Sequence, residues 1–308
     1  MTELERRYRW LLRAYPRAYQ QYRADEMLET LLATADNERR RPNLREAAAL
    51  VVGGLRARTG VDRLGSRSAL TSSVLRLSAL SLLVYGMTLW AGGPISYVAT
   101  ILSDGLYKPY VHKPFAWWFI VIPALLTIAL FAAAWGSYRL AFAVTILTVA
   151  AQLWSANWWV ESPWSVYNLH SAIVPRFWPA LLASLVLLGL LRAPRTPVAK
   201  PWAWPALGAL AVIALTPNPI NGWSDAPLMS LYAFAALAVI TAPVDARIPI
   251  IASVLLLAPA SAQATYHFYF KQAGWELGIS ITTSLILTAV MVTALAAGTI
   301  AARRQARM

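Results

Sequence analysis

Long stretches without a charged residue alternate with short charged segments over most of this chain. Eight such stretches follow one another: Leu77–Ser103, Pro114–Tyr138, Leu140–Val160, Phe177–Leu191, Pro201–Ser224, Ala226–Val244, Ile248–Phe270 and Leu277–Ala302. A helix that crosses a bilayer needs about 20 mostly apolar residues, with a range of about 17–25. The pattern therefore predicts an all-α, polytopic membrane helix bundle with about eight transmembrane helices.

Two of the eight stretches are less regular than the others. Phe177–Leu191 is short, but Arg176 and Arg192 at its ends could extend to the two membrane surfaces. Pro201–Ser224 is long enough but is interrupted by prolines, which favour a helix over residues 202–216 only. We expect a helix at both places, and the count of eight depends on them.

The distribution of Lys and Arg predicts the orientation, because these residues accumulate in short cytoplasmic loops. With the N-terminal segment in the cytoplasm, 23 of the 27 basic residues lie on the inner side. The outer loops hold the other four, which are Lys108, Lys113, Arg176 and Lys271. Eight spans also return the basic C-terminal tail to the cytoplasm. The sequence thus predicts a multi-pass protein of the cytoplasmic membrane with both termini inside.

Tryptophans gather near the predicted outer ends of the spans. They are Trp90, Trp117, Trp118, Trp154, Trp158, Trp159, Trp164, Trp178, Trp223 and Trp275. Trp commonly anchors helices at a membrane interface. Exposed Trp also binds sugars, lipids and cations. The outer excess is therefore open to two interpretations, an aromatic belt or a ligand-binding surface.

Residues 1–67 differ in composition from the rest of the chain. They hold 14 of the 27 Lys+Arg and 9 of the 14 Asp+Glu, although they are a small part of the sequence. We expect them to form a cytoplasmic three-helix domain, here called the head. Residues 68–308 are then the eight-helix transmembrane domain, here called the bundle.

Apolar residues at helical spacing predict the three helices of the head. They cover about Glu3–Tyr15, Pro16–Ala35 and Asn43–Gly60, and Asn43 with Glu46 resembles a capping box at the start of the third. The residues expected to be buried are Leu4, Tyr8, Leu11, Leu12 and Tyr15 in the first helix, Tyr19, Tyr22, Met27, Leu28, Leu31 and Leu32 in the second, and Leu44, Ala48, Val51 and Leu55 in the third.

Three segments of the head carry a family resemblance. They are Tyr8-Arg-Trp-Leu-Leu-Arg-Ala-Tyr-Pro-Arg-Ala-Tyr19, Tyr22-Arg-Ala-Asp-Glu-Met-Leu28, and Arg45-Glu-Ala followed by Gly54-Leu-Arg-Ala-Arg58. The head resembles the permease-prefix and HAAS-type domains of actinobacterial membrane proteins, although Ala24 replaces a usual Gly. The resemblance implies a helical pair ahead of membrane helices, with PadR-type regulators or ABC-type permeases as associates. It covers roughly 60 of the 308 residues and offers no catalytic residue.

The head is expected to contact a partner, because a domain of this size is marginally stable alone. A cytoplasmic or membrane protein could bind residues 1–67. Membrane lipid is the second expected partner, because basic residues near an anionic surface contribute about 1 kcal/mol each. An ordinary solvated face would equally account for these arginines. Nucleic acid is not expected, since the head has mixed charge and no helix-turn-helix pattern.

Several kinds of chemistry have no basis in the sequence. The absence of Cys excludes disulfides, thiolate metal sites and a Cys nucleophile. His112, His170 and His267 lack metal-ligand spacing, and no P-loop, GxGxxG or GxSxG motif occurs. The spans contain almost no ionisable residue, which argues against a proton relay. We therefore expect no metal, no cofactor and no enzymatic activity.

One predicted outer loop holds a dense set of polar and aromatic residues. Glu161, Trp164, His170 and Arg176 lie within it. An acid, a base and a Trp in one loop could bind a polar ligand or serve acid–base chemistry. A hydrated connector with its charges in water is the alternative interpretation.

Three functions are compatible with this sequence. The first is a sensory or regulatory membrane protein whose head couples to a partner. The second is a permease-like subunit that works with a separate ATPase. The third is a membrane enzyme or binder that acts on a lipid or glycan at the outer face.

Overall fold

Every element of secondary structure in the described part of the chain is an α-helix. The computed structural model describes all residues except 1, 36–40, 60–66, 105–117, 161–173, 194–225, 273–280 and 306–308. Within the described part the helices are α1 (Glu3–Leu12), α2 (Arg17–Thr34), α3 (Leu44–Thr59), α4 (Arg67–Asp104), α5 (Trp118–Ala134), α6 (Tyr138–Val160), α8 (Val174–Leu190), α10 (Ala226–Thr241), α11 (Arg247–Gln272) and α12 (Ile281–Gln305). The all-α prediction is confirmed.

Three of these helices are long and apolar enough to cross a membrane. Their apolar segments are Ala69–Met87, Tyr138–Ser155 and Leu285–Arg304. Shorter apolar helices of 10–17 residues occupy Ile120–Ala134, Phe177–Leu190, Leu231–Thr241 and Arg247–Ser261. The described residues thus supply fewer full-length spans than the eight predicted. The helix expected at 202–216 lies outside the described residues.

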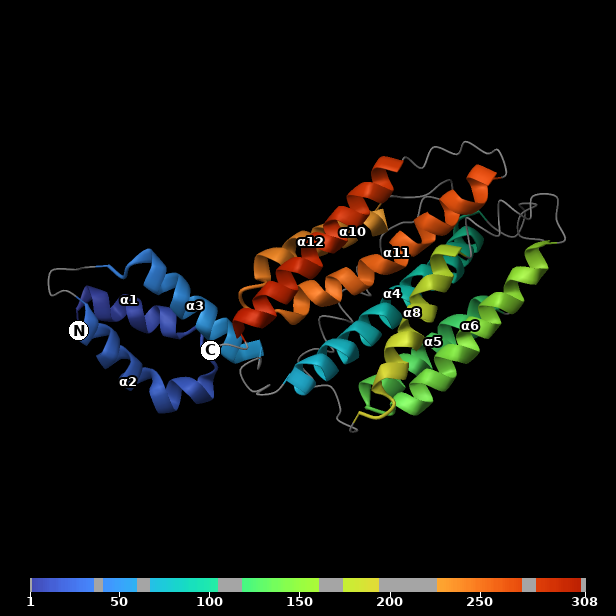
Figure 1. Ribbon diagram of the computed structural model, residues 1–308. Coiled ribbons are helices and arrows are strands. Elements are labelled where there is room, and N and C mark those ends of the chain that lie inside the picture. The colour runs from blue at the N-terminus through green and yellow to red at the C-terminus, as the bar shows by residue number, and fades with distance from the viewer. Residues whose placement is uncertain are drawn as a thin grey trace.

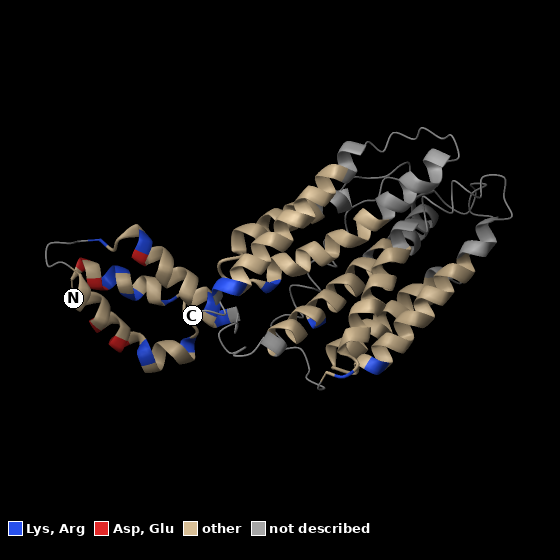
Figure 2. Cartoon of the chain, viewed as in Figure 1, with Lys and Arg blue, Asp and Glu red and all other residues tan. Residues whose placement is uncertain are grey.

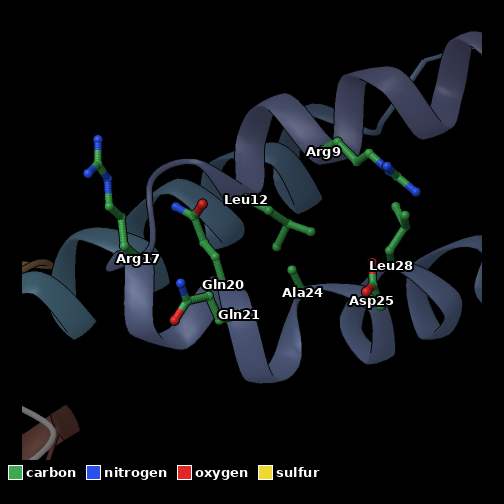
Figure 3. A pocket seen from close by; sticks show the side chains of 8 residues that line it. All are labelled: Arg9, Leu12, Arg17, Gln20, Gln21, Ala24, Asp25 and Leu28. Carbon is green, nitrogen blue, oxygen red and sulfur yellow. The ribbon is translucent and has the colours of Figure 1, made fainter.

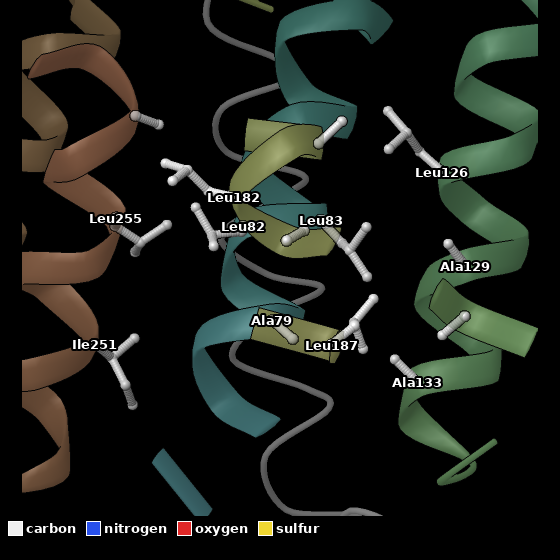
Figure 4. Close-up of a cluster of buried hydrophobic side chains, with 14 of the residues drawn as sticks. Ala79, Leu82, Leu83, Leu126, Ala129, Ala133, Leu182, Leu187, Ile251 and Leu255 are labelled. Atoms are coloured by element: carbon white, nitrogen blue, oxygen red, sulfur yellow. The ribbon is translucent and has the colours of Figure 1, made fainter. Parts of the chain in front are cut away.

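The bundle is arranged around α4, which packs against α5, α8 and α11 (Figure 1). α6 covers α5 and α8 on one side, and α10 and α12 pack on α11 on the other. Leu82 and Leu83 of α4 meet Leu126 of α5 and Leu187 of α8 in a buried cluster (Figure 4). The head adjoins one end of this bundle (Figure 1).

Alanines fill much of the space between the helices of the bundle. Ala79 and Ala129 are buried between α4 and α5, and Ala180 and Ala183 are buried on α8. Small side chains allow helix backbones to approach closely, which is how helices associate where lipid removes most of the hydrophobic driving force. Large residues such as Leu82 and Leu126 are buried as well, and others lie on the outside, as at Ile128, which is 49% exposed.

The first helix of the head folds as its sequence pattern predicts. Its five expected residues, Leu4, Tyr8, Leu11, Leu12 and Tyr15, are all buried in one cluster. Thr2 caps the helix with a full capping box to Glu5. The helix ends at Leu12, earlier than predicted, and the side chains of Gln20 and Arg58 donate to the Tyr15 carbonyl in the turn that follows.

Asn43 begins the third helix, as predicted. Its Oδ1 accepts from the backbone N–H of Arg45 at 3.2 Å, and its own N–H donates to Glu46 Oε2 at 3.4 Å. Glu46 Oε2 also accepts from Tyr8 Oη at 2.9 Å, which joins α3 to α1. Gly60, the predicted stop, lies outside the described residues.

The predicted buried face of α3 is wrong at three of its four residues, and only Val51 packs partly against the cluster of the head. Leu44 is 86% exposed, and Ala48 and Leu55 are exposed as well, whereas Leu50 and Gly54 are buried. The reason is that α3 crosses α1 at a glycine: a Cβ on Gly54 would lie 2.7 Å from the backbone carbonyl carbon of Ala14. The close approach fixes the rotation of α3, so its large apolar residues do not all turn inward.

One residue of the predicted α2 face is also wrong. Tyr22 is 86% exposed, whereas Leu28 is buried and Tyr19, Met27, Leu31 and Leu32 pack partly against the same cluster. Tyr22 lies on a different side of the helix from the buried residue Leu28. Leu28 follows it by six residues, which at 100° per residue is about 240° around the helix.

Candidate functional site: the inner junction

The predicted outer site is not among the residues that the structure describes. Glu161, Trp164 and His170 lie in an undescribed segment, and Arg176 belongs to the first turn of α8, where its side chain is not described. A ligand site at that face therefore stays a prediction. Among the described residues no group of three His, Cys, Asp or Glu side chains could hold a metal ion.

The described residues instead converge where the head meets the bundle. The short connection from α10 to α11, residues 242–246, turns tightly because the N–H groups of Val244 and Asp245 both donate to the Thr241 carbonyl, at 2.9 and 3.1 Å. This turn carries Asp245 inward, where its side chain is fully buried. A charged group in such a position requires a partner.

Arg247 is that partner. Its Nη2 lies 2.6 Å from Asp245 Oδ2, its Nε donates to Oδ1 at 2.9 Å, and its backbone N–H also donates to Oδ1 at 2.9 Å. The guanidinium and the carboxylate therefore form a two-pronged ion pair with further hydrogen bonds. The carboxylate also lies at the N-terminus of α11, where the helix dipole favours a negative charge.

The ion pair is tied to the central helix of the bundle. Arg247 Nη1 donates to Ser73 Oγ of α4 at 3.0 Å. Arg247 is 6% exposed, so this bond joins two packed helices rather than a solvated surface. The start of α11 is thereby held against α4 by a polar contact as well as by apolar packing.

The head reaches the same turn from the other side. Arg56, near the end of α3, donates from Nε to the carbonyl of Pro243 at 2.8 Å. Pro243 lies two residues before Asp245, so one side chain of the head bonds the turn that holds the buried ion pair. We call the set of Arg56, Ser73, Pro243, Asp245 and Arg247 the junction. Basic residues gather at this end of the bundle (Figure 2).

The last helix packs tightly behind the junction. Ala301 of α12 is buried against Ala242 and Ala246 of the turn. One helical turn earlier, a Cβ on Gly298 would lie 2.6 Å from Ile250 Cγ1 and 3.2 Å from the Ile250 backbone nitrogen. A displacement of the turn would therefore press on α12 as well as on α4.

A second polar contact lies on α4 near the same end. Arg76 Nε donates to Tyr138 Oη at the start of α6, and its guanidinium lies 5.7 Å from the centroid of the Tyr138 ring. Ser73 and Arg76 are three residues apart, so α4 is connected to α11 and to α6 within one turn. This end of the bundle is thus bonded across three helices.

A hollow in the head does not have the properties of a catalytic site. It has a volume of about 430 Å³ and lies between α1 and α2 (Figure 3). Two of its polar groups are already engaged: Arg9 pairs with Glu5 at 3.1 Å, and Gln20 Nε2 donates to the Tyr15 carbonyl at 2.7 Å. Arg17 extends away from the hollow (Figure 3).

The ion pair was not predicted from the sequence: Asp245 was not among the expected site residues, and Arg247 was only one of the basic residues of the predicted inner loops. The available signal was that Asp245 is the one acidic residue in the predicted inner loops of the bundle, two positions from an arginine. An isolated acid beside a base in an apolar segment indicates a buried pair, because an unpaired charge there is costly.

The junction offers neither a nucleophile with a base nor a free carboxylate, since Asp245 and Arg247 satisfy each other. What its geometry does is connect the head to α4, α11 and α12 of the bundle. Comparison with family models, with curated proteins and with solved structures finds no match to this chain.

Proposed function

We propose that this chain is a regulatory membrane protein whose cytoplasmic head responds to a partner and passes that response to the bundle without catalysis. The observation that carries the proposal is the hydrogen bond from Arg56 to the Pro243 carbonyl, beside the buried Asp245–Arg247 pair. This contact connects the end of α3 directly to the turn that precedes α11.

The proposed response uses the stiffness of the junction. A pull on α3 acts through Arg56 on the turn between α10 and α11. The ion pair resists bending within that turn, and the bond to Ser73 carries the displacement to α4. Packed interfaces switch between discrete arrangements more readily than they deform continuously, so a small displacement of the head would shift α4, α11 and α12 together.

The proposed topology has all eight apolar stretches crossing the bilayer and both termini in the cytoplasm. Support comes from the three full-length apolar helices and from the apolar outer surface of the bundle. Trp135, 73% exposed at the end of α5 nearest the junction, fits an interfacial anchor on the inner side. The basic residues near the junction then face the cytoplasm, as the charge distribution predicts.

Partner recovery followed by hydrogen exchange tests this function. Full-length protein is purified from mild detergent, and copurifying proteins are identified by mass spectrometry. Exchange at residues 241–250 is then measured with and without the recovered partner. The proposal predicts that the partner changes this exchange in the native chain and not in Arg56→Ala, although it binds both. Arg45→Ala, an exposed change on the same helix, should behave as the native chain does.

Two results would contradict the proposal. A partner whose binding leaves exchange at 241–250 unchanged in the native chain would remove the coupling. An ATPase as the sole specific partner would favour the permease-like function, in which the head serves assembly with the ATPase.

A further inference from the structure

The head carries a basic groove with exposed apolar residues at its base. Trp10 of α1 is 66% exposed and Leu44 of α3 is 86% exposed, and both line a hollow of about 580 Å³. Arg6, Arg7 and Arg41 line the same hollow. Large apolar side chains exposed together and surrounded by charge are typical of interaction surfaces.

The groove keeps a positive charge after its own acids are counted. Glu3 pairs with Arg6 and Arg7, so these three residues together contribute one positive charge. Glu46 on α3 is bonded to Tyr8 and to the Asn43 backbone. Arg41, just before α3, adds a second positive charge. An acidic surface with an aromatic residue would complement this groove.

The outer face of α2 has that composition. Tyr22, Glu26 and Glu29 recur at positions i, i+4 and i+7, which places them on one side of the helix. All three are exposed, and Tyr22 is 86% exposed. This acidic stripe points away from α1, because Leu31, nine residues after Tyr22 and so about 180° round α2, packs against the cluster that α1 shares.

The groove and the acidic stripe cannot meet within one head. The groove lies between α1 and α3, whereas the stripe lies on the side of α2 that faces away from α1. They can meet only between two copies. We propose that the acidic stripe of one copy docks in the basic groove of a second copy, with Tyr22 against Trp10 and Leu44 and with Glu26 and Glu29 against the arginines.

Lipid is a less suitable occupant of the groove because of where the groove lies. Arg56 contacts the inner end of the bundle, and Leu44 is 12 residues earlier on α3, or about 18 Å along the helix. The head extends away from the end of the bundle (Figure 1). The groove therefore faces the cytoplasm beyond the membrane surface. The contact is head-to-tail, so it builds rings or open rows of copies.

This inference goes beyond the proposed function, and only its argument against lipid rests on the topology proposed there. It is tested with cysteines, because the native chain has none. Full-length Leu44→Cys and full-length Tyr22→Cys are purified, mixed in detergent at low salt and oxidised. The mixture should give several times more disulfide-linked dimer than either variant alone, and the yield should fall at high salt because the charges are screened. Leu55→Cys mixed with Tyr22→Cys is the matched control from the same helix as Leu44 and should stay at background.

Charge exchange makes the test specific. Glu29→Lys in the Tyr22→Cys copy should lower the dimer yield about fivefold, the size expected for one interfacial ion pair. Arg41→Glu in the Leu44→Cys copy should restore it. Both positions are exposed, so these changes leave the core of the head intact.

Three results would overturn the inference. The first is a mixed yield no higher than the Leu55→Cys control, and the second is a charge exchange without effect. The third concerns lipid and uses a fluorophore attached to Leu44→Cys. The membrane would be the occupant if its emission shifts to the blue only in nanodiscs that contain phosphatidylglycerol, and not with increasing protein in phosphatidylcholine nanodiscs.

Discussion

The head and the bundle are both all-α and both bury large apolar side chains, but they differ in the small residues that they bury and in what covers their outer faces. The head buries large residues such as Tyr8 and Leu12, and its exposed side carries ion pairs such as Glu5 with Arg9. The bundle buries many alanines and exposes large residues such as Ile128 and Leu140. In the proposed topology the difference follows from the surroundings, because lipid accepts large apolar side chains on the outside of a helix, whereas water favours charged ones.

The polar groups of the two regions follow the same contrast. In the head, polar side chains face water and form ion pairs on the surface, which contribute little stability. In the bundle, hydroxyl groups bond to their own helix, as when Thr145 Oγ1 donates to the Ala141 carbonyl at 2.6 Å. Asp245 and Arg247 are the charged exception within the described bundle, and they lie where it meets the head.

The largest expected effect is at the junction. Asp245→Ala leaves Arg247 buried without its carboxylate, which costs about 3–5 kcal/mol. We expect a markedly lower unfolding midpoint for the full chain in detergent, followed by Trp fluorescence. Asp245→Ala combined with Arg247→Met should recover part of the loss, because no unpaired charge remains. If the single change is as mild as a surface substitution, the pair is not buried as described.

A charge introduced on the outer face of each region tests most directly whether the two faces meet different surroundings. Ile128→Lys places an ammonium group against lipid in the proposed topology and should cost about 2.5–3.5 kcal/mol near the bilayer centre. Tyr22→Lys on the exposed face of the head should change stability by no more than about 0.5 kcal/mol. Chemical unfolding in nanodiscs measures both. Equal effects would mean that the two outer faces meet the same solvent.

The crossing of α1 and α3 sharpens the comparison within the head. Gly54→Ala brings a Cβ to 2.7 Å from backbone atoms of Ala14, which cannot move away separately, and should cost about 1–3 kcal/mol. Gly53→Ala is the matched control: its Cβ meets the Tyr15 hydroxyl at 2.6 Å, and that side-chain end can shift. Hydrogen exchange in α1 should rise clearly more for Gly54→Ala. The reverse order would refute the helix crossing.

The smallest expected effect is a pH dependence at the first turn of α1. The hydrogen bond from Arg7, aided by the charges of Arg6 and Arg7, holds the pKa of Glu3 below its ordinary value of 4.5. The stabilisation is therefore complete above pH 4.5 and is lost as the pH falls through the lowered pKa. Glu3→Gln should lower the unfolding midpoint slightly at pH 7 and have no effect in stronger acid. A difference that grows on acidification would contradict this sign.

Sequence patterns predicted the structure where large apolar residues determine packing. The stripe of α1 is correct because five large side chains share one helical face and nothing small competes with them. The start of α3 is correct because Asn43 makes a local cap. The segment expected at Phe177–Leu191 is confirmed as a helix, since α8 spans Val174–Leu190 and lacks only the last predicted residue.

The same patterns failed where close approach or pairing determines the structure. Gly54 sets the rotation of α3, but a glycine carries no weight in a hydrophobic pattern. Asp245 was counted as part of a loop, because its burial depends on a turn and on an arginine whose placement the pattern does not give. The junction therefore could not be predicted from the sequence pattern. The outer loop with Glu161 and His170 stays a prediction.

The central claim is that the end of α3 touches the turn between α10 and α11. The most direct measurement links Arg56→Cys to Pro243→Cys in the otherwise cysteine-free full chain with a short bifunctional maleimide, and the linked peptides are detected by mass spectrometry. The control is Arg45→Cys with Pro243→Cys, about 16 Å further along the helix. We expect efficient linkage within one chain for the first pair and almost none for the control. Equal linkage of both pairs, or linkage of neither, would contradict the junction and the function proposed from it.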